Sequence, residues 1–450
     1  MTRSDKTQVV IIGAGAAGLT AARELGAAGI DVMILEARDR IGGRILTVRD
    51  AHTPSPIELG AEFIHGTAEP LQPVIAAAAL RVASIDGTRW EATGRTLRRL
   101  DDLWTRLDRV MRRVKASRLT DESFDAFLAR RPGGESLASE RQLAARFVRG
   151  FHAADTALVS TRTLAESGSP GEDEREQRLA RFVDGYDTVV EWLAAPLHQH
   201  LRLSHIVTRV RWSKGEVEVE SSHPDGTRRA DLRARTAVIT VPLGVLQAAP
   251  GQTGAIEFDP GLPQKSRALQ HLAMGPVVRL VFRFRERFWS GDAFRARGRR
   301  VDLDSMSFLH TRDRDFPVWW TGYPFQSPLL VAWCGGPDAR RLAQLDRRAL
   351  ESRAISRLSA HLGMPTRRLT ALVEETWFHD WLHDPFARGA YSYPLVGGTD
   401  APAELARPLR GTLFFAGEAT DASGSTGTVH GAITSGRRAA VQVKRAVNKK

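Results

Sequence analysis

The chain has 450 residues, of which 42% are hydrophobic and 26% charged, a composition typical of a globular protein long enough for two domains. Its net charge of +12 comes mainly from arginines that are scattered along the whole chain. Proteins that bind nucleic acid usually gather their basic residues on one face or in one tail, so this distribution argues against a nucleic-acid partner. The single cysteine, Cys334, excludes an internal disulfide and favours a reducing, cytoplasmic compartment. No stretch of the sequence approaches the roughly 20 consecutive apolar residues of a membrane span.

The first 36 residues carry the most specific pattern. The sequence predicts a strand over 9–12, a helix over 19–28 and a second strand over 32–35. The motif Gly13-Ala14-Gly15-Ala16-Ala17-Gly18 separates the first strand from the helix, and Glu36 follows the second strand. In a βαβ unit, such glycines let backbone amides approach a pyrophosphate, and the acid accepts hydrogen bonds from a ribose. The sequence therefore predicts a dinucleotide-binding domain.

Two further motifs follow the second strand. Residues 40–44 read Arg-Ile-Gly-Gly-Arg, and residues 58–66 read Glu-Leu-Gly-Ala-Glu-Phe-Ile-His-Gly. Adjacent glycines between arginines suit a second phosphate contact, because the backbone comes close and a guanidinium binds an oxyanion with two hydrogen bonds. A nicotinamide enzyme does not need this second motif.

The rest of the chain alternates between helical and strand patterns. Helical spacing predicts helices over 100–114, 124–151, 186–197, 346–361 and 431–447. Apolar or alternating runs predict strands over 201–203, 206–212, 216–221, 236–241, 277–284, 319–320, 329–334 and 413–417. The polar segment 168–174 predicts an exposed loop.

The run from Gly13 through residues 40–44 to 59–66 resembles the flavin-containing amine oxidase family, which includes monoamine oxidases, polyamine oxidases and lysine-specific histone demethylases. The resemblance covers essentially the whole chain and implies FAD as the cofactor. It implies an α/β fold, with a Rossmann-type FAD-binding domain built from 1–80, 195–250 and 395–450. A mixed α+β substrate-binding domain is expected to comprise 81–194 and 251–394. We expect neither the long helical insertion of the demethylases nor the C-terminal membrane anchor of animal monoamine oxidases.

The resemblance places FAD-binding residues in all three segments of the first domain. Leu413 to Glu418, followed by Thr428 and Val429, resembles the C-terminal flavin signature of the family, and Val207 matches a residue whose backbone holds the adenine. The expected FAD-binding residues are Gly13, Gly15, Ala16, Ala17, Gly18, Glu36, Ala37, Arg38, Gly42, Gly43, Arg44, Gly60, Ala61, Glu62, Val207, Trp381, Gly417, Glu418, Thr428 and Val429. Ala390 stands where covalently flavinylated monoamine oxidases carry cysteine, so FAD is expected to be noncovalent.

The resemblance also implies the residues around the substrate. Trp381 and Tyr391 resemble the aromatic wall beside the flavin, where a tyrosine face suits an amine nitrogen, although aromatic residues more often belong to the core. Thr428 stands where monoamine oxidases carry a second tyrosine. His65 matches a position near the substrate mouth of polyamine oxidases, and a purely structural histidine is an equal alternative.

Residue 279 departs from the family pattern. Family members usually read Gly-x-x-x-Lys-Val here, and their lysine holds a water against flavin N5, whereas this chain has Arg279. Strand alternation separates Arg279 from Val278 and Leu280, so a charged residue on a solvated strand face is the alternative. A guanidinium stays protonated and cannot act as a base, but it can bind that water or supply positive charge during oxygen reduction.

These observations predict an FAD-dependent oxidase of primary or secondary amines. Hydride passes from the amine-bearing carbon to flavin N5, the imine hydrolyses, and O2 takes the electrons to give H2O2. The expected partners are a small-molecule amine and O2, without nucleic acid or membrane, and a homodimer is allowed. His379 and His383 have a spacing known from metal sites, but Pro385 follows and a third ligand is not evident, so no metal is expected.

Two alternatives remain open. An L-amino acid oxidase is the first, although its relatives place a carboxylate-binding arginine where this chain has Phe63; Arg279 can bind a carboxylate instead. The second is a flavin-binding protein without amine oxidase activity, for which the substitution at 279 is the main support.

Overall fold

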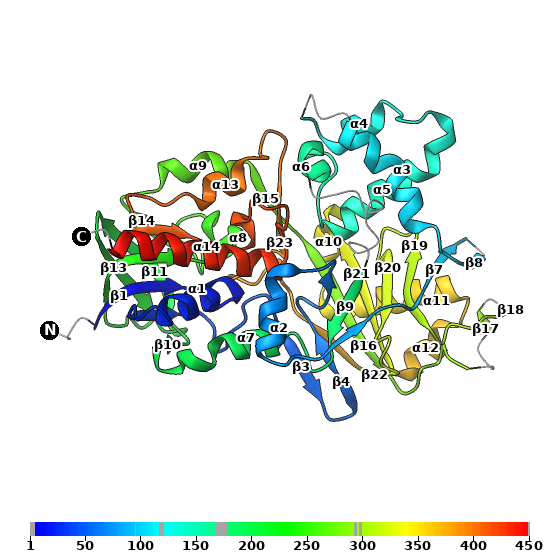
Figure 1. Cartoon of the computed structure of the whole chain (residues 1–450). Coiled ribbons are helices and arrows are strands. Elements are labelled where there is room, and N and C mark those ends of the chain that lie inside the picture. Colours follow the sequence, from blue (N-terminus) through cyan, green and yellow to red (C-terminus); the bar gives the residue numbers. More distant parts are fainter. Residues whose placement is uncertain are drawn as a thin grey trace.

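The computed structural model describes residues 5–94, 96–116, 121–166, 178–291, 295–296 and 299–448. Two large sheets lie side by side, one at the end that carries both termini and one at the opposite end (Figure 1). The predicted loop over 168–174 lies outside the described residues. Helices cover the sheets, and an additional group of helices stands above the second sheet (Figure 1). The α/β class expected from the sequence is confirmed.

The first sheet has eight strands in the order β10-β2-β1-β13-β12-β11-β14, and β24 also pairs with β13. These strands are β1 (Asp5–Ile12), β2 (Val32–Leu35), β10 (Leu201–Arg202), β11 (Ile206–Ser213), β12 (Glu216–Ser222), β13 (Leu232–Ile239), β14 (Glu257–Asp259) and β24 (Leu413–Phe415). The pairs of β1 with β2 and β13, and of β13 with β24, are parallel. Parallel strands are covered on both faces, which explains the continuous apolar runs in β1 and β13.

Helices α1 (Ala16–Gly26) and α14 (Val429–Asn448) pack together against this sheet, with α7 (Asp187–Ala194) beside α1 (Figure 1). A Cβ at Gly436 would lie 2.4 Å from the Ala17 carbonyl oxygen, so glycine permits this close approach of α14 to α1. The helix predicted over 186–197 ends at Ala194 and continues as a 3₁₀ helix (Ala195–His200), because Pro196 lacks the N–H that an α-helix needs.

The second sheet has seven strands in the order β22-β16-β21-β20-β19-β7-β8, and all neighbours except β19 and β7 are antiparallel. Its strands are β7 (Thr88–Thr93), β8 (Thr96–Arg99), β16 (Val277–Phe284), β19 (Met306–Thr311), β20 (Val318–Thr321), β21 (Leu329–Gly335) and β22 (Val373–Phe378). Every residue of β16 is buried. The alternative of a solvated strand face around Arg279 is therefore wrong, because neighbouring elements cover both faces of this strand.

Helices cover one face of the second sheet, whereas apolar residues of the 46–63 segment, among them Ile57 and Leu59, pack against the other. One face packs on α10 (Pro337–Leu342), α11 (Arg347–Leu362) and α12 (Thr366–Leu372). The additional helical group comprises α3 (Leu103–Ala116), α4 (Phe124–Ala129), α5 (Ala138–Phe151) and α6 (Thr161–Glu166). The single helical stretch expected over 124–151 is interrupted by Pro132, Gly133 and Gly134, which end α4 before α5 begins.

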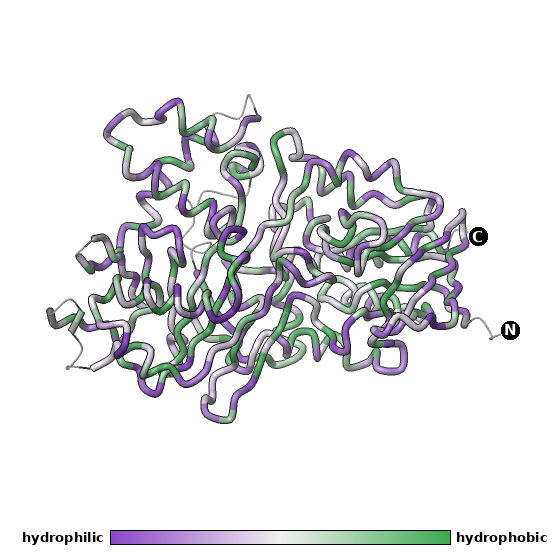
Figure 2. The backbone as a smooth tube through the Cα atoms, turned by 180° about the vertical axis from the view of Figure 1, so that it is seen from behind, coloured by the Kyte–Doolittle hydropathy of each residue, from purple (hydrophilic) through white to green (hydrophobic). Residues whose placement is uncertain are grey.

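Shorter elements complete the fold. They are β3 (Thr47–Asp50), β4 (Thr53–Glu58), β5 (Ile64–His65), β6 (Val82–Ser84), β9 (Leu179–Phe182), β15 (Leu272–Gly275), β17 (Arg295–Ala296), β18 (Arg299–Arg300), β23 (Tyr391–Pro394), α2 (Gln72–Ala77), α8 (Leu243–Leu246), α9 (Pro263–Gln270) and α13 (Ala401–Ala406). Hydrophobic residues follow the strands inside both halves, whereas the outer helices alternate hydrophilic and hydrophobic residues (Figure 2).

The first sheet takes its strands from three separate stretches of the chain, namely 5–35, 201–259 and 413–415. Strand β14, at 257–259, lies beyond the boundary at 250 that the sequence suggests. The division of the chain into an FAD-binding and a substrate-binding domain stays a prediction. Among the described residues, no helix is long and apolar enough to cross a bilayer.

Candidate active site

One cavity of about 1090 Å³ is lined by residues from both sheets and from the additional helical group. This volume reaches the upper end of the roughly 300–1,000 Å³ found for pockets of drug-sized ligands, so it can hold a dinucleotide and a small substrate. All site residues expected from the sequence line this cavity except Gly18. Segments far apart in the chain, from Gly13 to Val429, therefore share one continuous wall.

The glycines between β1 and α1 have three different roles. Gly13 has φ +107°, a conformation that L side chains rarely adopt. A Cβ at Gly18 would lie 2.0 Å from the Gly13 carbonyl oxygen, so this glycine allows α1 to pack against the turn and does not face the cavity. A Cβ at Gly15 would meet nothing within 4 Å, and the residue lines the cavity at the N-terminus of α1.

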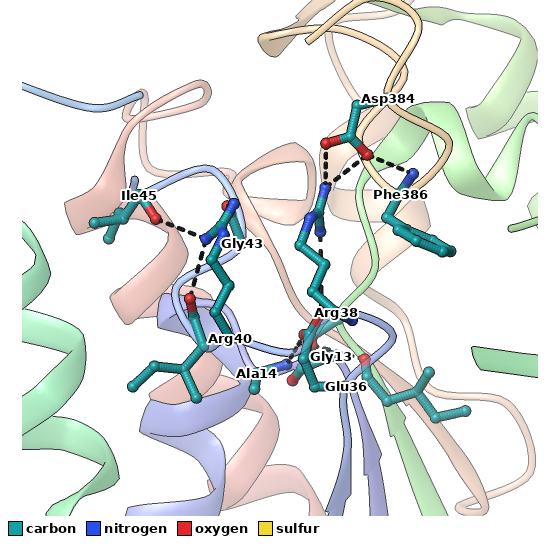
Figure 3. Close-up of polar contacts among 12 residues, drawn as sticks. Gly13, Ala14, Glu36, Arg38, Arg40, Gly43, Ile45, Asp384 and Phe386 are labelled. Carbon is teal, nitrogen blue, oxygen red and sulfur yellow. Dashed lines mark hydrogen bonds and ion pairs between the residues drawn. The ribbon is translucent and has the colours of Figure 1, made fainter. Parts of the chain in front are cut away.

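Glu36 is tied to this turn by backbone hydrogen bonds (Figure 3). Its carboxylate accepts from the N–H of Ala14 at 2.7 Å and from the N–H of Arg38 at 2.9 Å, and it is buried. The Arg38 guanidinium donates to both oxygens of Asp384 at 2.7–2.8 Å. Although burial alone would raise the pKa of Asp384, hydrogen bonds from His379 and Arg38 hold it well below its usual range.

The loop at 40–44 lies directly against the glycine turn. Gly42 donates its N–H to the Ala14 carbonyl at 2.9 Å. Arg40 donates to the backbone carbonyls of Ile41, Gly43 and Ile45 at 2.9–3.2 Å, so it holds its own loop together (Figure 3). Its guanidinium therefore has a structural use in addition to any phosphate contact.

The C-terminal signature joins the same wall through Glu418. This buried carboxylate pairs with Arg44 at 2.8 Å and accepts from the Ser392 hydroxyl at 2.7 Å and the Gly427 N–H at 3.0 Å. The Thr428 hydroxyl accepts from the Gly431 N–H at 3.0 Å and thereby caps α14. The N-termini of α1 and α14 both line the cavity, and helix N-termini favour anions and electron-rich carbonyls.

Arg279 belongs to a buried cluster of charges. It is 4% exposed, donates to the Gly60 carbonyl at 2.8 Å and forms a close ion pair with Glu62. Glu62 also pairs with Arg181 at 3.2 Å and accepts from the Trp320 indole N–H at 2.9 Å. Two arginines sharing one carboxylate leave a formal charge of +1 beside the cavity. Because Glu62 holds Arg279, this arginine is not a free carboxylate clamp.

Two aromatic residues of the cavity wall are fixed by hydrogen bonds. The Trp381 indole N–H donates to the Leu59 carbonyl at 2.7 Å, and the Tyr391 hydroxyl donates to the Phe151 carbonyl at 2.7 Å. Strand β23 places Tyr391 opposite Gly275 of β15. Burial raises the pKa of Tyr391 well above its usual range, so its hydroxyl stays protonated.

Histidines line the same part of the cavity. Burial, reinforced by His430 and His152, lowers the pKa of His65 to about 4, and burial does the same for His152. Both are therefore neutral near pH 7. His65 stands edge-on to Phe151, with 5.3 Å between the ring centroids.

Val207 and the pair His379 and His383 were also singled out in the sequence. Val207 is buried in β11 and lines the cavity, at an irregular step in the ladder between β11 and β12. His379 bonds to Asp384 at 2.8 Å, whereas His383 bonds to Asp380 at 2.7 Å, so the two histidines face different partners. Within the described residues, no group of three side chains is arranged to hold a metal ion.

Sequence reasoning missed several residues of the cavity wall. Arg181 and Trp320 complete the cluster around Glu62, and Arg89 and Arg146 line the part of the cavity below the additional helical group. No motif marks these positions, because each comes from a different element. In the stretch that carries Arg89, the charged residues Arg89 and Glu91 alternate with the apolar Trp90. This short alternation is the local sequence signal for a strand.

The cavity fits the cofactor that the sequence implies. Gly15 leaves empty space at a helix N-terminus, where a phosphate can approach the backbone. The Glu36 side chain lies at one end of the turn and offers hydrogen-bond acceptors there. The adjacent glycines Gly42 and Gly43 lie against Gly15. These features match the requirements of a dinucleotide.

Comparison with known proteins agrees with this geometry. The family model for flavin containing amine oxidoreductase matches residues 16–444. Polyamine oxidase 2 of Arabidopsis thaliana is 29% identical over 96% of this chain and 87% of its own length, and polyamine oxidase 3 of Oryza sativa subsp. japonica is 30% identical over 98% and 90%. The structure of cyclohexylamine oxidase from Brevibacterium oxydans IH-35A superposes with a TM-score of 0.79 at 22% identity, covering 98% of this chain and 100% of that one. The chain therefore belongs to the flavin-containing amine oxidoreductases and is an FAD-dependent amine oxidase.

Proposed function

We propose that this enzyme oxidises primary or secondary amines at the part of the cavity formed by Trp381, Tyr391 and Arg279, with FAD held noncovalently along the glycine turn. The observation that carries the proposal is the continuity of one cavity between these residues and the dinucleotide turn. FAD, when bound, takes a hydride from the amine-bearing carbon and passes the electrons to oxygen. The chain itself supplies binding, orientation and exclusion of water.

Orientation of the amine follows from the two fixed aromatic rings. Trp381 and Tyr391 each use their polar atom on a backbone carbonyl, so neither side chain can swing away from the wall without breaking a hydrogen bond. Rigid apolar walls hold the reacting carbon in place and exclude water, which is a main source of rate enhancement in such reactions. Because the Tyr391 hydroxyl is occupied and stays protonated, this residue positions the substrate and transfers no proton.

The proton of the amine is lost before reaction. His65 and His152 have pKa values of about 4 and are weak bases near pH 7. Arg279 remains protonated and bonded to Glu62. The amine therefore enters as the neutral minority species present in solution, and the lining residues need only accommodate it.

Arg279 is proposed to act through its charge. The cluster of Arg279, Arg181 and Glu62 has a formal charge of +1 at the cavity wall. Fixed positive charge in a site sheltered from water stabilises negative charge that develops during oxygen reduction. The remaining N–H groups of the Arg279 guanidinium can also hold a water in the cavity.

Noncovalent binding of FAD has its own support. Ala390 offers no nucleophile, and the single cysteine of the sequence, Cys334, lies in β21 and is not among the residues that line the cavity. A cytoplasmic location, the absence of a nucleic-acid partner and a homodimer stay predictions from the sequence.

An L-amino acid oxidase is the weaker candidate. The carboxylate of an α-amino acid would lie next to the reacting carbon, near Phe63 and Arg279. Phe63 carries no charge, and Arg279 already has a carboxylate partner in Glu62. A second carboxylate there would have to share that guanidinium with Glu62.

Anaerobic mixing of the purified holoenzyme with a panel of amines and matched α-amino acids tests the proposal. We expect amines to bleach the flavin absorbance faster than their α-carboxylated counterparts. Trp381→Leu should slow this reduction, whereas Trp192→Leu, a control on α7 away from the cavity lining, should not. Failure of every amine to bleach the flavin would refute amine oxidation at this site, and faster bleaching by amino acids would favour the weaker candidate.

A further inference from the structure

Two arginines of the cavity wall have no acidic partner within the described part of the chain. Arg89 on β7 and Arg146 on α5 both line the cavity. Among the described residues, no carboxylate forms an ion pair or hydrogen bond with either guanidinium. Neighbouring arginines differ, since Arg98 pairs with Glu91 at 2.7 Å and Arg106 lies 3.9 Å from Glu140. The missing partners therefore distinguish these two arginines from their surroundings.

The strand register brings the site together. β7 pairs with β19 in parallel, with Phe308 opposite Arg89 and His310 opposite Glu91. Alternate residues of a strand share a face, so all four residues stand on the same side of the sheet. The Arg89 guanidinium carbon lies 5.5 Å from the ring centroids of both Phe308 and Trp104, the latter on α3. Aromatic faces thus flank this charge without neutralising it.

The nearest acid does not supply the missing charge. Glu91 is buried and is shared by Arg98 at 2.7 Å and Arg312 at 3.6 Å. Burial lowers the pKa of Arg89, and burial together with the charge of Arg312 lowers the pKa of Arg146 despite the opposing effect of Glu91. Charges held out of water without a partner are costly, and an anionic ligand would remove that cost.

A neutral polar group stands beside the two charges. Burial, and next to it the charge of Arg89, lowers the pKa of His310 to about 4. Its Nε2 atom is buried without a hydrogen-bond partner among the described residues. The arginines and His310 all line the cavity, so this wall combines two cations with one unused polar nitrogen. Such a set suits the oxygens of a carboxylate.

We propose that Arg89 and Arg146 bind an anionic group of the substrate, in the simplest case a carboxylate, at the end remote from the amine. The inference rests on the proposed function, because it places the amine beside Trp381, Tyr391 and Arg279. The substrate class is then an amino acid whose amine and carboxylate are separated by several carbons.

The separation follows from the rings between the two ends. The Arg279 guanidinium lies 5.4 Å from the Trp320 ring, the rings of Trp320 and Phe308 are 6.2 Å apart, and Arg89 lies 5.5 Å from Phe308. Two aromatic side chains therefore stand between the charge proposed to face the reaction and the unpaired arginine. An α-carboxylate next to the reacting carbon does not span this distance, whereas an ω-carboxylate does.

The same charges disfavour polyamines, which carry a second ammonium group. That group would lie near two unpaired guanidinium groups, and like charges repel strongly in a partly buried site. The relatives named polyamine oxidases therefore do not fix the substrate of this chain.

The test compares three substrates of equal length, namely pentylamine, cadaverine and 5-aminopentanoate, together with longer homologues of each. Anaerobic stopped flow with the holoenzyme gives the rate of flavin reduction and the apparent Kd. We expect the ω-amino carboxylate to bind about ten- to a hundredfold more tightly than the monoamine, as one or two charge-assisted hydrogen bonds provide. Cadaverine should bind no better than pentylamine.

Arg89→Gln and Arg146→Gln should abolish this preference while leaving the reaction with pentylamine nearly unchanged. Arg113→Gln, an exposed control on α3, should leave the preference intact. Binding of hexanoate, followed by calorimetry, adds a readout that needs no turnover and should weaken in the Arg89 and Arg146 variants only. If Arg89→Gln does not fold, Arg146→Gln and the wild-type series still decide the matter.

The two levels of inference fail in different ways. If each monoamine binds and reacts as well as the ω-amino carboxylate of the same length, for pentylamine and 5-aminopentanoate and for their longer homologues, the anionic site is refuted while amine oxidation stands. If no amine reduces the flavin, the proposed function fails, and hexanoate binding alone decides whether Arg89 and Arg146 hold a carboxylate.

Discussion

Gly15→Ala separates cofactor binding from folding more cleanly than other changes in the glycine turn. Gly15 has φ −78° and ψ 179°, angles that alanine adopts readily, and its added Cβ would meet no protein atom within 4 Å. The apoprotein should therefore fold with unchanged stability. The methyl group would instead occupy the space that a phosphate needs at the N-terminus of α1.

The expected size of the effect follows from overpacking. Forcing a methyl group into a packed contact costs about 1–3 kcal/mol, which corresponds to a Kd for FAD about 5- to 150-fold higher. At an FAD concentration of 100 times the wild-type Kd, bound FAD stabilises the wild-type protein by about 2.7 kcal/mol. A hundredfold rise in Kd would reduce that contribution to about 0.4 kcal/mol.

The assay is urea unfolding of apoprotein and FAD-saturated protein, combined with fluorescence titration of FAD. Gly26→Ala is the matched control, because Gly26 lies exposed in α1 and its added Cβ also meets nothing within 4 Å. This control should gain up to about 1 kcal/mol of stability and keep its FAD affinity. Unchanged FAD affinity in a well-folded Gly15→Ala protein would show that the cofactor does not approach this turn.

Three further predictions concern buried charges. Arg279→Met should slow reoxidation of the flavin by oxygen about ten- to a hundredfold, as measured by stopped flow. Glu62→Gln makes the cluster around Glu62 more positive and should not slow this step. Equal slowing by both substitutions would indicate that the cluster has a purely structural role. Burial raises the pKa of Glu58 to about 8, so the folded state keeps a proton that the unfolded state loses above about pH 4.5. The free energy of unfolding should therefore fall by up to about 1.4 kcal/mol per pH unit between pH 5 and 8. Glu58→Gln should remove this slope in urea unfolding curves measured across that range. An unchanged slope in the variant would show that Glu58 is not the group responsible. Glu36→Ala should raise the Kd for FAD by about tenfold or more, while Glu36→Gln, which keeps one acceptor, should lose less; equal affinity in all three proteins would make Glu36 a mere strand-end acid.

The parts of the fold that depend on neighbouring residues could be predicted from the sequence. The turn from β1 to α1 and the strand β2 follow from a short apolar run, three glycines and one acid within 36 residues. Helix α11 follows from apolar spacing and from Asp346, whose side chain caps its first turn. These patterns are local, so no tertiary information is needed to recognise them.

The strands over 277–284 and 329–334 were predicted, but strand β7 of the same cavity wall escaped prediction for a physical reason. β7 reads Thr-Arg-Trp-Glu-Ala-Thr, and its Arg89 and Glu91 occupy positions where a half-buried strand normally carries apolar residues. Cavity-facing charges hide the strand because the pattern depends on hydrophobic contrast. The partner of Arg279 was equally hidden, since Glu62 lies 217 positions away in the chain.

The three-part construction of the first sheet also sets an order of events during synthesis. The βαβ unit leaves the ribosome early, but β24 and α14, which complete its sheet and cover α1, come from the last part of the sequence. Until then, the face of α1 that will receive Gly436 of α14 stays exposed to water, and the wall containing Glu418 does not exist. A nascent chain of this enzyme therefore cannot complete the wall of the flavin cavity until its final segment has been synthesised. Chains truncated before β24 and α14 lack that wall altogether and should not persist as partial flavoproteins.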